Sequence, residues 1–225
     1  MTYSIIQAVT NNYDQVYDCC DNNACRRLLF TDRVYKVDGW EQHIITPTVN
    51  YPWDDIFKIR WNPFDYTNTD YVIWVDGSIR ITGSLKKYID AMFQGNYDFA
   101  TLKHPWRTNI FDEYAEWIRI RNYPMTKAFC WMAFMEKSGW KPETPGLYQV
   151  GVCIFKNTPL VKEFCRYVWA LLHLFEQNHA ERLDQTIATY VLNHIYKDRL
   201  SVLPLSEDIY KSGPSMKIHG VHPNR

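Results

Sequence analysis

The sequence of 225 residues lacks a long hydrophobic run. No stretch approaches the roughly 20 apolar residues of a membrane-spanning helix, and the N-terminal segment MTYSIIQAVTNNYD turns polar too early for a secretory signal peptide. An excess of basic charge is also missing, because 25 Lys and Arg residues balance 25 Asp and Glu residues. We therefore expect no integral membrane segment and no nucleic-acid partner held by phosphate neutralisation.

Cysteine is sparse, and its six residues form no CxxC pair of the kind that binds zinc. The nine glycines are isolated, so no glycine-rich phosphate-binding loop is present. The GxSxG and HExxH motifs are absent as well, which argues against two large classes of hydrolase. We expect reduced thiols, a cytoplasmic location and a single domain, since this length suffices for one large core.

Aromatic residues, in contrast, are abundant. They make up 16% of the chain and include 9 Trp and 16 Tyr. One interpretation is a core and a surface that use large rings. The other is a cleft that stacks sugars or bases, because Tyr and Trp combine an apolar face with a polar edge.

Strand and helix patterns alternate along the chain, which predicts an α/β fold with a mostly parallel, mixed central sheet flanked by helices. The clearest strand is YVIWVD, apolar on both faces as in the centre of a covered sheet. Strands are expected at 3–9, 27–30, 43–45, 71–76, 97–103 and 200–205, with a strand or hairpin at 146–157. Helices are expected from Asp54 to Pro63 and at 83–93, 109–121, 123–140, 158–177 and 182–195, with a loop-like tail at 210–225.

Polar residues follow several of these strands where they end. In parallel sheets, ligands gather in the crevice at the carboxyl ends of strands. That rule predicts one crevice lined by residues 10–13, 31–32 and 76–78 and by His104.

Asp76 ends the central strand and is followed at once by Gly77 and Ser78. Asp-Gly is a frequent turn dipeptide, so a purely structural turn is one interpretation. The alternative is a carboxylate that faces a hard divalent cation bridging phosphate oxygens. Such a cation would neutralise a diphosphate leaving group.

Two histidines lie near the C-terminus, in KIHGVH. His219 and His222 are either solvent-exposed or one of them completes a metal site begun by Asp76. Of the two, His219 is the better candidate ligand, because Gly220 lets the backbone approach closely.

Three further groups are ambiguous. Asp184 and Gln185 open a helix, where Asp184 either interacts with the helix dipole or, with Gln185, orients sugar hydroxyls. Arg107, which follows His104, either pairs with Glu113 or binds an anionic donor group. In TPGLYQVGV, the glycines at 146 and 151 mark a β-bulge or a close ligand approach, and the glutamine at 149 is a hydrogen-bonding candidate.

Taken together, these segments resemble the GT-A type of nucleotide-sugar glycosyltransferases and, more narrowly, the DUF616 group of glycosyltransferase domains. The order IWVDGS, HPWR and DQ is the most specific part. The matching segments are FTD (30–32), KIRWNPFDY (58–66), YVIWVDGSIRI (71–81), KHPWRTNIFDEY (103–114), GLYQVGVCIFKN (146–157) and RLDQTIATYVL (182–192).

The resemblance implies a GT-A, Rossmann-like single domain, with residues 1–104 as the nucleotide-binding half and 105–225 as the acceptor and metal-completing half. It implies Mn²⁺ or Mg²⁺ and a nucleotide-diphosphate sugar, with a UDP-sugar favoured. The metal ligands would be Asp76, Ser78 and His219, although Ser78 stands where the general pattern has a second acid. The donor-binding residues would be Ala8, Thr10, Asn12, Tyr13, Arg60, Trp74, Val75, Asp76, Gly77 and Ser78.

The implied reaction moves a sugar to a hydroxyl of a polysaccharide or glycan precursor, with peripheral membrane contact where that precursor is lipid-linked. Asp184 and Gln185 would be catalytic, with either stereochemical outcome open. His104, Arg107, Gln149 and Gly151 would bind substrate. The alternative is a carbohydrate-binding or inactive transferase-like protein. A metal-dependent phosphoesterase would need more clustered Asp and His.

Overall fold

The computed structural model describes residues 1–11, 14–48, 52–121, 123–176, 184–206 and 215–218. Its strands are β1 (Tyr3–Val9), β2 (Arg26–Thr31), β3 (Glu41–Ile44), β4 (Tyr71–Val75), β5 (Ile79–Ile81), β6 (Phe99–Lys103), β7 (Tyr148–Lys156), β8 (Val202–Leu205) and β9 (Met216–Ile218). Its helices are α1 (Pro52–Trp61), α2 (Lys86–Gln94), α3 (Ile110–Arg121), α4 (Met125–Lys137), α5 (Pro159–Glu176) and α6 (Asp184–Tyr190). Short 3-10 and π segments cover Pro63–Asp65 and Val191–Ile195.

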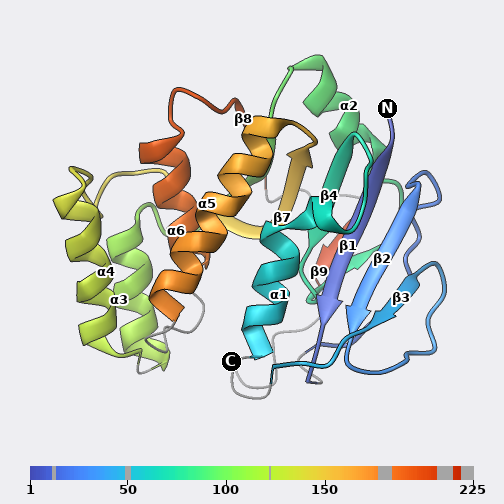
Figure 1. Cartoon of the computed structure of the whole chain (residues 1–225), viewed down its shortest axis with the longest axis horizontal. Coiled ribbons are helices and arrows are strands. Elements are labelled where there is room, and N and C mark those ends of the chain that lie inside the picture. The colour runs from blue at the N-terminus through green and yellow to red at the C-terminus, as the bar shows by residue number, and fades with distance from the viewer. Residues whose placement is uncertain (12–13, 49–51, 122, 177–183, 207–214, 219–225) are drawn as a thin grey trace.

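A seven-stranded sheet with the order β3-β2-β1-β4-β7-β6-β8 forms the centre of the molecule (Figure 1). β7 runs antiparallel to both of its neighbours, whereas the other pairs in this sheet are parallel. The fold is therefore α/β and Rossmann-like with a mostly parallel, mixed sheet, as the sequence predicts.

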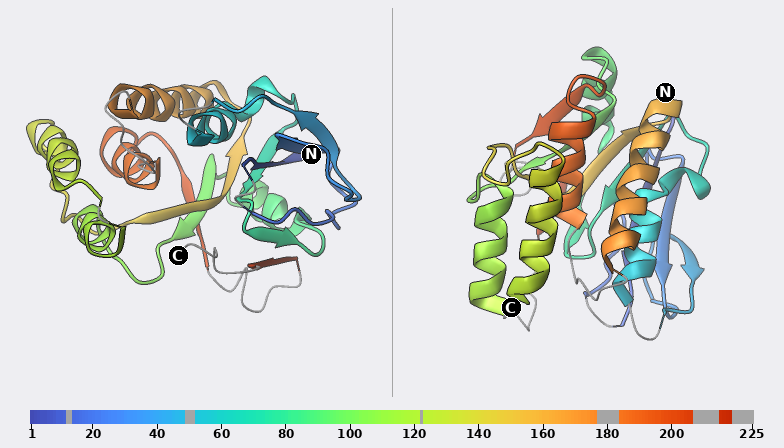
Figure 2. Two further views of the ribbon diagram at one scale, coloured as in Figure 1. Left: turned by 90° about the horizontal axis from the view of Figure 1, so that it is seen from below. Right: turned by 60° about the vertical axis from the view of Figure 1, so that its left-hand side comes forward.

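The core lies on both faces of this sheet, which explains why its central strands are apolar throughout. In β4, Val72 and Trp74 pack with α1 and α5, and Tyr71, Ile73 and Val75 pack on the opposite face with α2 and β5. This alternation is the two-residue period of a strand. α3 and α4 lie side by side at one end of the molecule, next to α6 (Figures 1 and 2).

A second, two-stranded sheet was not predicted. β5 and β9 pair antiparallel, with Ile79 opposite Ile218 and Ile81 opposite Met216. The expectation of a loop-like tail at 210–225 is thus wrong for Met216–Ile218. Strands of three residues carry too little periodicity to be recognised in a sequence, and this pairing joins segments that lie far apart in the chain.

Two predicted helix starts have different outcomes. The hydroxyl of Thr158 accepts a hydrogen bond from the Val161 N–H at 3.2 Å and caps α5, which begins at Pro159. α2 begins at Lys86 with Leu85 as its cap, three residues after the predicted start at residue 83, and the Ser84 hydroxyl accepts the Lys86 N–H at 3.2 Å. Among the residues that the structure describes, no helix combines the length and the apolarity needed to cross a membrane.

Candidate functional site

The strand order reverses between β1 and β4. From β1 the chain continues outward to β2 and β3, then returns to add β4 on the other side of β1. The carboxyl ends of strands at such a switch point form the usual ligand crevice of an open α/β sheet. Buried Thr10 follows β1 and Asp76 follows β4, so two of the predicted donor-binding residues lie at the ends of these adjacent strands.

The loops after β1 and β2 are joined at the same edge. The backbone N–H of Asn11 donates to the Asp32 carboxylate at 2.8 Å. Asn11 has a φ of 56°, in the left-handed region that asparagine tolerates better than most residues. The predicted Asn12 and Tyr13 lie outside the described residues, as does His219.

The backbone of Asp76 is held from three sides. Its N–H donates to the Gly151 carbonyl at 2.8 Å, and its carbonyl accepts from the Ile79 N–H at 2.9 Å. The buried amide of Gln7 donates to the same carbonyl at 2.9 Å and to that of Ile79 at 3.0 Å. Asp76 therefore forms a turn, but it does so through its backbone N–H and carbonyl. The turn does not use the Asp76 carboxylate, which is available for other contacts.

The Asp76 carboxylate meets Arg60 and Asp184, which come from distant segments. The Arg60 guanidinium, from the last turn of α1, donates to Asp76 and to Asp184 at the start of α6. Trp74 completes the arrangement, because its indole N–H donates to Asp76 Oδ1 at 2.9 Å and its ring lies 4.7 Å from the guanidinium carbon. We call Arg60, Trp74, Asp76 and Asp184 the switch-point cluster.

The members of the switch-point cluster differ in exposure. Arg60 and Asp184 are buried, whereas the Asp76 side chain is 34% exposed. Burial raises the pKa of Asp184, which Arg60 counteracts and Asp76 reinforces. Burial opposes the charge on Arg60, yet Asp184 and Asp76 together raise its pKa. One cation thus faces two carboxylates, and the excess negative charge lies at the partly exposed Asp76.

Gly77 lies where a side chain has no room. A Cβ built on it would approach Val9 Cγ2 to 2.8 Å and Asp14 Oδ2 to 2.7 Å. Ser78 follows, partly buried, while Ala8 and Val75 are buried strand residues whose side chains enter opposite core faces. Glycine is therefore required for the loops after β1 and β4 to approach each other at the carboxyl ends of these strands.

The described residues offer hard oxygen ligands for a cation, namely the carboxylate of Asp76 and the hydroxyl of Ser78. No group of three or more His, Cys, Asp or Glu side chains suited to a metal gathers within the described ranges. Mg²⁺ and similar ions are commonly held by one or two carboxylates plus substrate phosphates. These residues fit such a substrate-bridged ion better than an ion held by protein ligands alone.

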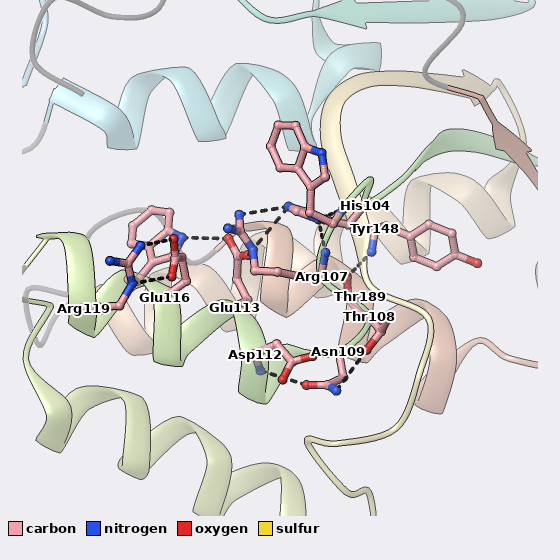
Figure 3. A network of polar contacts seen from close by, with 12 residues as sticks. His104, Arg107, Thr108, Asn109, Asp112, Glu113, Glu116, Arg119, Tyr148 and Thr189 are labelled. Atoms are coloured by element: carbon pink, nitrogen blue, oxygen red, sulfur yellow. Dashed lines mark hydrogen bonds and ion pairs between the residues drawn. The ribbon is translucent and has the colours of Figure 1, made fainter.

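A second cluster of charges lies at the carboxyl end of β6 (Figure 3). Arg107 forms an ion pair with Glu113 of α3, and the Trp117 indole N–H donates to Glu113 at 2.7 Å. His104 Nδ1 accepts the backbone N–H of Arg107 at 3.0 Å, and its Nε2 lies 3.0 Å from the Arg107 guanidinium. We call His104, Arg107 and Glu113 the β6-end cluster.

The β6-end cluster is closed to solvent around His104, whose side chain is 3% exposed. Burial, and then the neighbouring Arg107, lower the pKa of His104 to about 4. Burial raises the pKa of Glu113, against the influence of Arg107. Of the two predicted roles for Arg107, the structure shows the ion pair with Glu113. With this lowered pKa, His104 is neutral at pH 7.

The remaining predicted substrate residues lie on β7. The register of β6 and β7 shifts between Thr101 and Leu102, which makes a bulge around Gly151. Thr101 Oγ1 donates to the carbonyls of Gln149 and Val152 at 3.0 Å each. The bulge interpretation is thus correct for Gly151, whose carbonyl accepts the Asp76 N–H at the end of the β4–β7 pair.

The two predicted catalytic residues are placed differently. Every residue of α6 is buried except Gln185, which is partly exposed. Asp184 is directed at Arg60, whereas Gln185 is the helix residue with solvent access beside the switch-point cluster.

Two notable residues were not singled out from the sequence. Gln7 is the only polar side chain between Ile5 and Val9 in an apolar strand, and that contrast was the available signal. Trp106, in the HPWR segment, is 79% exposed. Nothing in the sequence distinguishes an exposed tryptophan from a buried one.

Comparison of the chain with models of known protein families finds no match, and neither does comparison with curated proteins.

Proposed function

We propose that this protein is a glycosyltransferase that moves a sugar from a nucleotide-diphosphate donor to a hydroxyl of a glycan or polysaccharide precursor. One observation supports this above the others. Asp76, Asp184 and Arg60 converge from three separate segments on the switch point of an α/β sheet, where such sheets bind ligands.

In this proposal the donor nucleotide lies over the loops after β1 and β2, next to Thr10. Its diphosphate faces Asp76 and Ser78 through Mn²⁺ or Mg²⁺, which supplies positive charge to the leaving group. The pairing of Ile79 with Ile218 supports a contribution of the C-terminal segment to this cation site. Ile79 is only three residues after Asp76 in the chain, so the pairing brings Ile218 close to the end of β4. His219 remains the proposed third ligand.

Arg60 and Asp184 have supporting roles in this proposal. Asp184 orients the Arg60 guanidinium from its buried side, and Arg60 in turn fixes one oxygen of Asp76. The sugar-contacting group is then Gln185, the partly exposed residue of α6. Its amide can donate to and accept from sugar hydroxyls.

A thermal-shift screen of UDP-, GDP-, CMP- and dTDP-sugars, each with and without Mn²⁺, tests the proposal. A donor present at about 100 times its Kd adds about 2.7 kcal/mol of stability, which corresponds to roughly 5–10 °C in Tm for a domain of this size. We expect one donor class to raise Tm only when Mn²⁺ is present. Mn²⁺ alone should have little effect, because the nucleotide completes its ligand set.

The variant Asp76→Asn should abolish this donor-dependent shift. Its matched control is Asp90→Asn, which removes a similarly exposed carboxylate that pairs with Lys86 on α2. Unchanged donor stabilisation in Asp76→Asn would contradict the assignment of Asp76. The absence of a shift with every donor would contradict the proposed function itself.

A second candidate is a carbohydrate-binding or inactive transferase-like protein. It is favoured by the contacts of Asp76 Oδ1, which accepts hydrogen bonds from both Arg60 and Trp74, and by the neutral hydroxyl of Ser78. Calorimetry separates the two candidates. Saccharide binding that depends on neither nucleotide nor Mn²⁺ would favour the second.

We further propose a cytoplasmic location, which the absence of disulfides among the six cysteines supports. A lipid-linked acceptor would bring the protein into peripheral contact with a membrane. Fractionation of cells that express the full chain tests both statements, because a cytoplasmic enzyme with a lipid-linked acceptor divides between the soluble and membrane fractions.

A further inference from the structure

Trp106 is the most exposed of the large hydrophobic side chains described, with 79% of its surface accessible. An indole in water forgoes the free energy that its burial would provide, so tryptophan is highly buried on average. Here nearly the whole ring is presented to solvent from the turn that follows β6.

This turn is fixed although its tryptophan is exposed. The N–H groups of Trp106 and Arg107 both donate to His104 Nδ1, at 3.3 and 3.0 Å. The Trp106 ring also packs edge-on against the His104 ring, with the ring centroids 6.1 Å apart and an interplanar angle of 75°. One face of the indole can therefore bind a ligand without the entropic cost of ordering the turn.

The buried charges beneath the turn act on the same segment. Glu113 pairs with Arg107 and accepts from Trp117, and the Arg107 guanidinium lies 3.0 Å from His104 Nε2, so these contacts hold the His104 ring in place (Figure 3). Partly buried ion pairs of this kind add little net stability, because desolvation offsets their attraction. Their effect here is to hold the backbone of residues 104–107 in one conformation.

The turn lies at the same end of the sheet as Asp76, where β4 and β6 have their carboxyl ends. β6 is separated from β4 by β7 alone, so the two strand ends are about 10 Å apart in the plane of the sheet. β6 and β4 also run in the same direction, since each is antiparallel to β7. A ligand on Trp106 would therefore lie beside a donor bound at the switch-point cluster.

We propose that Trp106 is a stacking platform for the saccharide acceptor, and that His104, Arg107 and Glu113 are positioning residues for it. A pyranose ring offers an apolar C–H face that packs on an indole, while its hydroxyls stay in water or meet polar groups. This inference rests on the proposed function, for which it names the acceptor class as a glycan with an accessible pyranose face.

The test uses the full chain without nucleotide and four defined probes: maltotriose, cellotriose, chitotriose and xylotriose. Saturation-transfer NMR and titration report binding of each. We expect at least one probe to bind, with affinity at least tenfold weaker in Trp106→Ala and partly kept in Trp106→Phe. Phe129→Ala, which removes a 54% exposed ring on α4, is the matched control and should bind as the wild type does.

The positioning role has its own pair of variants. His104→Asn keeps a side-chain oxygen that can accept the two turn N–H groups, whereas His104→Leu has no acceptor. We expect Asn to restore most of the saccharide affinity that Leu loses, although both retain Trp106. Equal loss in the two variants would contradict the positioning role.

The outcomes separate this inference from the proposed function. Trp106→Ala should retain the donor-dependent and Mn²⁺-dependent thermal shift that Asp76→Asn loses. If donors stabilise the protein but no probe binds, or probes bind equally well to Trp106→Ala, the platform is wrong and the transferase proposal stands. If probes bind through Trp106 but no donor stabilises the protein, the platform stands and the transferase proposal fails.

Discussion

The switch-point cluster and the β6-end cluster are built from similar parts and differ in what they leave accessible. Each pairs one arginine with acidic side chains at the carboxyl ends of strands in the same sheet. In the β6-end cluster the charges balance, since one arginine meets one glutamate beside a neutral histidine. In the switch-point cluster, one arginine meets two aspartates, and Asp76 reaches solvent.

This difference leads us to expect the cation at the switch-point cluster. A balanced set of charges has little to gain from a further ion, whereas an unbalanced set with a partly exposed carboxylate attracts a cation. The distance in sequence between the paired residues supports the same expectation. Arg107 and Glu113 are close in sequence and join a turn to the next helix, while Arg60 joins segments 124 residues apart at the switch point.

Removing Arg60 should have the largest effect on the stability of the fold. Arg60→Ala leaves Asp76 and Asp184 without their shared cation, and loss of one member of a buried pair costs about 3–5 kcal/mol. Urea unfolding followed by circular dichroism measures the change. The control Arg199→Ala removes an exposed pair with Glu163 and should leave the free energy of unfolding nearly unchanged.

A compensating variant sharpens this comparison. Arg60→Met with Asp184→Asn removes the buried cation and one buried anion together, so it should regain much of the stability that Arg60→Ala loses. If the double variant is as unstable as the single one, the unpaired carboxylates do not cause the loss, and the contacts of the guanidinium with the Trp74 and Phe57 rings are what stabilises the fold.

The β6-end cluster should respond to acid through His104. The pKa of His104 is about 4 in the folded chain, below its ordinary value, so the unfolded chain binds this proton first as the pH falls. The contribution of neutral His104 to the free energy of unfolding is fully present above about pH 6.5 and is lost as the pH approaches 4. This change is about 3 kcal/mol at most. Burial raises the pKa of Asp184 instead, so its contribution changes with the opposite sign.

The measurement is the difference in unfolding free energy between wild type and His104→Asn from pH 7 to pH 4. Other carboxylates titrate equally in both proteins and cancel, so the difference should shrink as the pH falls. A difference that stays constant from pH 7 to pH 4 would contradict the burial of His104 as a neutral ring.

Gln7 should matter through the turn that carries Asp76. Gln7→Leu removes the donor to the carbonyls of Asp76 and Ile79, and an unsatisfied buried polar group costs about 1–3 kcal/mol. Urea unfolding gives the cost, and donor affinity should fall with it because the turn positions the carboxylate. Gln15→Leu at an exposed position is the control, and equal effects of the two changes would show that the turn does not depend on Gln7.

Much of the fold could be predicted because its central strands are long and apolar, as β1 and β4 are. The rule that ligands gather at carboxyl strand ends also grouped Thr10, Asp76 and His104, and these residues do follow the parallel strands β1, β4 and β6. β5 and β9 escaped prediction because three residues carry no reliable period.

The contacts of the site were less predictable than its position. The sequence indicated Arg60 near phosphates and Asp184 near the sugar, but an ion pair between residues 124 apart has no local signature. The exposure of Trp106 depends on the turn that His104 holds, which is likewise set by tertiary contacts. The direction of a side chain at a strand end is set by tertiary packing, which a short stretch of sequence does not determine.

Ser78 should have the smallest effect and gives the finest test of the unbalanced cluster. A hydroxyl is a weak, neutral ligand, so Ser78→Ala should weaken Mn²⁺ binding in the presence of nucleotide only a few-fold, or about 1 kcal/mol. Ser78→Asp adds a second charged ligand beside Asp76 and should strengthen it. Calorimetric titration of Mn²⁺ with saturating nucleotide measures both. Tighter binding in Ser78→Asp, but not in Asp90→Glu on α2, would place the ion at the end of β4, whereas no change in either would remove it from that position.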